Sequence, residues 1–156
     1  MLAQQEPAQQ ACRFGDLELA RRFLERAEEA GGDTALAAAA LAETAVGQGD
    51  WPGATAAAFR SLQRLRPTIA TPFPPMLSNV VRSFALYGPP QFAVPVLETA
   101  RTTRPSWDLA HYGSVQVYAR WGGDRCRQAA ALAEELTRFG WTVGEAAALL
   151  RPCERR

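Results

Sequence analysis

Few side chains in this sequence have the types and spacing that catalysis or metal binding requires. His111 is the only histidine, and an imidazole can act as a general base or as a metal ligand. A zinc site needs three or four ligands at characteristic spacing. The cysteines Cys12, Cys126 and Cys153 lie far apart and form no Cys-x-x-Cys pair. We therefore predict no metal site.

Other catalytic patterns are equally weak. The chain contains no Gly-x-Ser-x-Gly elbow, and without any lysine it cannot contain a P-loop. The carboxylate pairs Glu28-Glu29 and Glu134-Glu135 are expected on solvated helix faces. We predict that the protein is not an enzyme and has no catalytic residues and no cofactor.

The cysteines and the termini suggest a compartment. An odd number of widely spaced cysteines argues against a disulfide framework and favours a reducing, intracellular setting. The N-terminus lacks the pattern of a secretory signal, and no apolar run is long enough for a membrane span. The sequence does not distinguish cytoplasm from mitochondrion or plastid.

Arginine supplies every basic residue, and the net charge is +1. Near-neutral charge gives no overall field that would attract nucleic acid or an anionic membrane. Each guanidinium nevertheless offers a planar fork of donors to a carboxylate or phosphate. Two of these arginines, Arg82 and Arg120, are expected to line a groove.

Helices must position these side chains, because apolar residues recur with the helical period of 3.6. Alternating strand patterns are absent, and glycine or proline separates the helical segments. We expect helices over 17–30, 35–46, 52–65, 76–86, 106–121, 125–139 and 143–150. A further helix follows the turn at 87–90 and runs to about residue 102. Pro95 is a misfit, so its helix either starts late or kinks.

The prolines in segment 67–75 cannot lie inside one helix. We predict one domain, 1–156, in which 67–75 is a connector, a hinge between two half-arrays, or a functional loop.

Turn glycines recur at a nearly constant spacing. They are Gly15, Gly49, Gly88 and Gly123, at intervals of 34, 39 and 35 residues (49 − 15, 88 − 49, 123 − 88). Alanine follows each of the first three by five positions. Such a period is typical of stacked helix pairs. The sequence thus predicts an all-α, right-handed α-solenoid of about four antiparallel helix pairs.

The pattern resembles the tetratricopeptide repeat, whose second helix carries small and large residues at fixed distances from the turn glycine. Gly88, Ala93, Leu97, Ala100 and Pro105 match all five positions of that helix. The resemblance implies a fold that binds other proteins in a concave groove lined by the first helix of each pair.

The fourth copy is similar to a pentatricopeptide repeat, a relative that binds single-stranded RNA. The matching segments are 111–115, 118–124 and 130–140. This resemblance implies a base-reading pair, and Asn79 with Asp108, one residue out of register, comes nearest to it.

Positions counted back from the turn glycines predict which residues line the groove. The candidate partner-binding residues are Gln9, Glu43, Ser78, Asn79, Arg82 and Arg120. Arg82 and Arg120 are expected to face one ligand and to anchor an acidic segment bidentately.

The chain ends lack the polar caps that isolated arrays need, so we expect a homo-oligomer or docking into a larger assembly. We predict a non-catalytic protein–protein interaction module, a structural or assembly subunit of a larger complex. The alternative is an RNA-binding pentatricopeptide-like protein, organellar in location.

Overall fold

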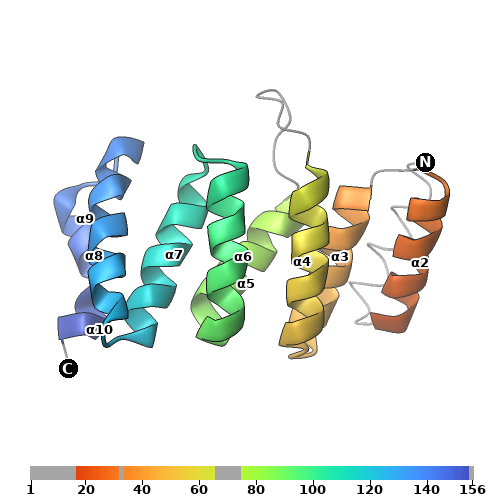
Figure 1. The fold of residues 1–156 in the computed structure, drawn as a ribbon, viewed down its shortest axis with the longest axis horizontal. Helices are drawn as coiled ribbons and strands as arrows, with labels where there is room; N and C mark the ends of the chain where they lie inside the picture. Colours follow the sequence, from red (N-terminus) through yellow and green to blue (C-terminus); the bar gives the residue numbers. More distant parts are fainter. Residues whose placement is uncertain (1–16, 32–33, 66–74, 155–156) are drawn as a thin grey trace. The chain divides into compact units, whose positions relative to one another are not determined.

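The protein is all-helical in every stretch that the computed structural model describes, which comprises residues 17–31, 34–65 and 75–154 (Figure 1). The elements are α2 (Leu17–Glu29), α3 (Thr34–Gly47), α4 (Trp51–Arg64), α5 (Pro75–Tyr87), α6 (Pro90–Thr103), α7 (Asp108–Trp121), α8 (Arg125–Glu135), the 3₁₀-helix η1 (Leu136–Phe139), α9 (Val143–Ala148) and α10 (Arg151–Glu154). The predicted all-α class is confirmed. No helix in these stretches is both long and apolar enough to cross a membrane.

Helices pack mainly against their neighbours in the chain: α2 on α3, α3 on α4, α6 on α7, and α7 on α8. The chain divides into two compact units, Met1–Val80 and Val81–Arg156, so the boundary falls inside α5. The predicted connector at 67–75 lies outside the described residues except for Pro75, the first residue of α5.

In the first unit, α3 is the central helix, which explains its composition. Almost its whole circumference is buried, and half of its residues are alanine. Alanine favours helix and lets neighbouring helices approach closely. The flanking helix α2 instead buries a single face, formed by Ala20, Leu24 and Ala27.

Polar contacts tie the outer helices of this unit together. Arg60 and Arg64 of α4 both donate to Oε1 of Glu28 in α2, at 2.5 and 2.9 Å. The hydroxyl of Ser61 donates to the carbonyl of Ala35 at 2.7 Å and joins α4 to α3. These contacts join α2 to α4 and α4 to α3.

In the second unit, a glycine allows a close helix crossing. A Cβ atom at Gly113 would lie 3.0 Å from Cδ2 of Leu97 and 3.1 Å from Cβ of Ala85. Larger residues at this position in α7 would therefore push against α5 and α6. Ala93, five positions after its turn glycine, is completely buried.

The C-terminal elements cover one end of the second unit. Leu136 of η1 and Ala146 of α9 join a buried cluster with Val115, Ala119 and Ala129. Thr142 and Glu145 form a reciprocal capping box at the start of α9. The predicted helix 125–139 ends as α8 at Glu135 and continues as η1.

A disulfide corrects the inference drawn from cysteine spacing. Cys126 at the start of α8 is bonded to Cys153 of α10, with 5.9 Å between the Cα atoms. Because α10 packs on α7, it brings Cys153 back to the beginning of α8, 27 residues earlier in the chain. The wide linear spacing could not reveal this contact. The disulfide also weakens the argument for a reducing compartment.

Candidate functional site

The six predicted partner-binding residues are distributed over both units. Gln9 lies outside the described residues. In the first unit, Glu43 is half-buried on α3, Ser78 is half-buried on α5, and Asn79 is exposed on α5. Burial raises the pKa of the Glu43 carboxyl, because desolvation disfavours its charged form. Arg82 and Arg120 lie in the second unit, and Arg82 is exposed.

Arg120 forms hydrogen bonds with backbone carbonyls of this unit. Its Nη2 lies 3.3, 3.1 and 2.7 Å from the carbonyl oxygens of Phe84, Ala85 and Gly88. The last carbonyls of a helix lack partners within the helix, and Arg120 supplies a donor to them at the end of α5. Burial lowers the pKa of this guanidinium. These contacts already engage Nη2 of Arg120 within the second unit.

Replacing Arg120 by alanine is expected to lower the free energy of unfolding by about 1–3 kcal/mol, because the carbonyls at the end of α5 lose a charged donor. Arg82→Ala is the matched control on an exposed site and should change it by less than about 0.5 kcal/mol. Urea unfolding followed by circular dichroism measures both. Equal small losses would show that Arg120 does not hold α5.

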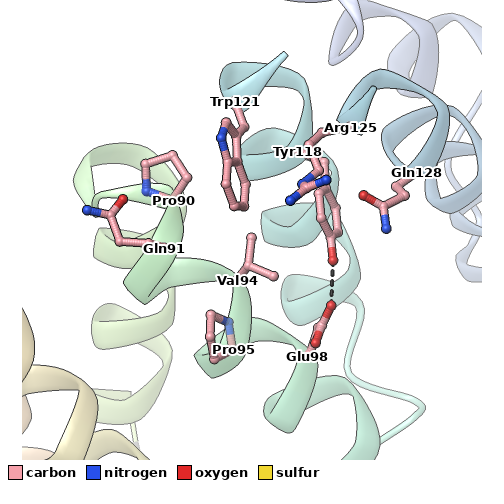
Figure 2. Close-up of a pocket in the computed structure, with 9 residues that line it drawn as sticks. All are labelled: Pro90, Gln91, Val94, Pro95, Glu98, Tyr118, Trp121, Arg125 and Gln128. Atoms are coloured by element: carbon pink, nitrogen blue, oxygen red, sulfur yellow. Dashed lines mark hydrogen bonds between the residues drawn. The ribbon is translucent and has the colours of Figure 1, made fainter. Parts of the chain in front are cut away.

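A pocket of about 380 Å³ opens on the surface of the second unit (Figure 2). We call it the Trp121 pocket. Helix α6 supplies one wall, the end of α7 supplies two aromatic rings, and the first turn of α8 supplies the remaining side chains. Its lining residues are Pro90, Gln91, Val94, Pro95, Glu98, Tyr118, Trp121, Arg125 and Gln128.

The binding residues predicted from the sequence include none of those that line this pocket. A signal was nevertheless present. Pro90, Val94 and Glu98 are spaced by four residues, and so are Gln91 and Pro95, which places them on neighbouring rows of one helix face. What the spacing could not show is that Trp121 would face that row.

Trp121 and Arg125 form a stacked pair at the mouth of the pocket. The Cζ atom of Arg125 lies 4.3 Å from the centroid of the Trp121 ring, a cation–π contact. The Trp121 side chain remains 37% exposed. Among the described residues, no carboxylate lies within ion-pair distance of Arg125. The stack therefore orients a positive charge that is not neutralised by a close ion pair.

Tyr118 and Glu98 form the second polar feature of the pocket. The Tyr118 hydroxyl donates to Oε1 of Glu98 at 2.5 Å, as the dashed line in Figure 2 shows. Burial, followed by this hydrogen bond and the charge of Glu98, raises the pKa of Tyr118 to about 12. At neutral pH the tyrosine is therefore a donor, and one carboxylate oxygen of Glu98 is already engaged.

The raised pKa of Tyr118 predicts a loss of stability in strong base. The unfolded chain loses this proton near pH 10, whereas the folded chain holds it to about pH 12, so the contribution is complete below pH 10 and declines through pH 12. The difference in ultraviolet absorbance between the parent and Tyr118→Phe locates the transition. Glu98→Gln should lower this pKa only in part, since burial is the larger cause. A phenol that titrates at pH 10 in the folded parent would contradict the assignment.

A proline inside α6 affects the same pocket. Pro95 is interior to the helix, so the predicted late start is wrong. Proline has no N–H, and the carbonyl of Gln91 therefore loses the donor that residue 95 would normally supply. Helix carbonyls point toward the C-terminus, which is the side of Pro95, and both residues line the pocket. The wall formed by α6 thus includes a backbone acceptor without its usual helical donor.

His111 lies elsewhere in the second unit and is buried. Its Nε2 lies 2.9 Å from the carbonyl oxygen of Pro105, and its ring is 4.8 Å from that of Phe139. A donor role for Nε2 explains the first contact. These contacts explain His111 as a residue that joins α7 to the preceding turn and to η1.

Comparisons with known proteins return no match: no family model, no curated protein and no solved structure matches this chain. The stacked helices are shown by the structure, while the tetratricopeptide and pentatricopeptide resemblances stay predictions.

Proposed function

We propose that this chain is a non-catalytic protein-interaction module, a right-handed array of the tetratricopeptide type that serves as a structural or assembly subunit. The observation that carries the proposal is the Trp121 pocket. Trp, Tyr and Arg dominate the binding energy of protein interfaces because they combine large apolar area with a polar group. Trp121, Tyr118 and Arg125 meet in this one pocket.

The chemistry of the lining suits recognition better than proton transfer. The lining includes no thiol, imidazole or aliphatic hydroxyl, which are the common nucleophiles and bases. Its one carboxylate, Glu98, accepts a hydrogen bond from Tyr118, whose pKa of about 12 keeps it protonated at neutral pH. What the pocket offers a ligand is an apolar surface, amides and one cation.

The stacked alanine-rich helices also support a binding role. Each helix packs mainly on its neighbours in the chain, as in a scaffold of stacked helix pairs. Scaffolds of this kind present long surfaces to other macromolecules.

Site-specific photo-cross-linking in extracts of the native source tests the proposal. A photoreactive residue at Gln128, inside the pocket, should capture a partner protein. The same residue at Arg127, exposed and outside the lining, is the matched control. The protein adduct should survive ribonuclease and disappear when Trp121→Ala is combined with the probe.

Three results would separate the alternatives. An adduct of twice the chain mass would identify a second copy as the partner. Capture of RNA at Gln128 would favour the pentatricopeptide-like alternative, although its reading pair, Asn79 and Asp108, is divided between the two units. Equal capture at Gln128 and Arg127, or capture that persists in Trp121→Ala, would reject the pocket as the binding site.

A further inference from the structure

We infer that the occupant of the Trp121 pocket is an extended peptide that places an acidic side chain on Arg125 and an apolar side chain against Trp121. This inference rests on the proposed function and adds the chemistry of the ligand. Three features of the pocket carry it: an oriented cation, a backbone carbonyl without its usual helical donor and an apolar wall.

The cation is Arg125. Its guanidinium is held over the Trp121 ring at 4.3 Å, so its side-chain entropy is already reduced before a ligand arrives. It is the first residue of α8, where the helix dipole adds positive potential. Asp124 precedes it but is exposed and lies outside the lining. A carboxylate can accept two parallel hydrogen bonds from such a planar fork.

Glu98 determines the direction in which the peptide lies, whereas Arg125 determines the charge of the ligand group. One of its oxygens accepts the Tyr118 hydroxyl, and Arg101 is positive on the next turn of α6. Glu98 therefore already has one hydrogen-bond partner, Tyr118, whereas Arg125 has no close carboxylate among the described residues. An acidic ligand group is attracted to Arg125 and repelled by Glu98, which fixes the direction in which the peptide lies.

The backbone acceptor is the carbonyl of Gln91, which Pro95 leaves without its helical donor. An extended peptide carries an N–H at each residue and can supply the missing hydrogen bond. The side-chain amides of Gln91 and Gln128 lie on opposite walls and provide further donors and acceptors (Figure 2). A ligand that joins an N–H, a carboxylate and an apolar group at separate points along its length is a peptide.

The apolar wall consists of Pro90, Val94, Pro95 and the exposed face of Trp121. A volume of about 380 Å³ accommodates a few side chains and no larger element. The pocket therefore suits an apolar residue adjacent to the acidic one, in a segment that is extended and not helical.

A peptide selection tests this inference. The full chain is the bait, and the library displays random peptides about twelve residues long. Selected peptides should carry Asp or Glu within about two positions of a large apolar or proline residue. Arg125→Gln should weaken the best peptide about 10- to 100-fold, the range expected for a charge-assisted hydrogen bond. Arg127→Gln, a neighbouring exposed arginine outside the pocket, should change the affinity less than about twofold.

Two further variants distinguish binding from folding. Arg125→Glu should no longer bind the acidic peptide, and it should bind the same peptide when Lys replaces the acidic residue. Pro95→Ala restores the N–H that bonds to the Gln91 carbonyl, so it should raise the melting temperature while weakening the peptide several-fold. A merely structural role for Pro95 predicts no such opposite movement.

The outcomes separate this inference from the proposed function. Peptides that depend on Trp121 but lack an acidic residue, or that resist Arg125→Gln, would overturn the ligand chemistry and leave the interaction module intact. Peptides enriched in Lys or Arg would assign the charged contact to Glu98 instead. A selection that yields no peptide dependent on Trp121 would overturn both.

Discussion

Replacing Phe84 by alanine is expected to lower the free energy of unfolding by about 3–5 kcal/mol. Phe84 is completely buried and is one of the largest fully buried side chains of the described residues. Its truncation leaves a cavity beside Gly88, at the end of α5 that Arg120 holds. Since a domain of this size has a total stability of about 5–15 kcal/mol, the loss is a large fraction of it.

Tyr87→Ala is the matched control for this prediction. It removes an aromatic ring from the same helix, but Tyr87 is 73% exposed, so the expected change is below about 0.5 kcal/mol. Urea unfolding followed by far-ultraviolet circular dichroism measures both variants. A loss for Phe84→Ala as small as that for Tyr87→Ala would contradict the packing of α5.

Removal of the Cys126–Cys153 disulfide is expected to have an effect of similar size. The bond closes a loop with a sequence separation of 27, and the chain-entropy relation gives about 3–4 kcal/mol for a loop of this length. The double variant Cys126→Ser/Cys153→Ser should therefore unfold at lower urea concentration. A reducing agent should move the parent to the same midpoint and leave the double variant unchanged.

The cysteines also provide the control. Cys12→Ser leaves this disulfide intact and should keep the effect of the reducing agent. Thiol titration of the purified, denatured parent should find one free thiol out of three cysteines. Three free thiols in protein purified without reductant would show that the bond does not form.

The helices could be predicted from the sequence because the signals that specify them are local. The spacing of Ala20, Leu24 and Ala27 predicts the buried face of α2, and alanine at half of the positions of α3 favours a helix that its neighbours approach closely. Glycines mark several turns, and Gly31 and Gly140 adopt positive φ angles of 69° and 88°. Such local preferences need no knowledge of the partner helix.

The site depends on contacts that no local pattern encodes. Counting back from a turn glycine places Arg120 on the correct helix, but its donors go to carbonyls 32 to 36 residues earlier. The cation–π pair of Trp121 and Arg125 requires the turn between α7 and α8 to close at a particular angle. The same holds for Cys126 and Cys153, which meet only after α10 folds back onto α7.

The disulfide makes a closed covalent ring out of residues 126–153. A protease that cuts after Arg138, which is exposed between the two cysteines, breaks one peptide bond of this ring but releases no fragment. The nicked protein therefore keeps its mass, apart from one added water, and its C-terminal helices stay attached to α8. The cut becomes visible on a gel only after reduction.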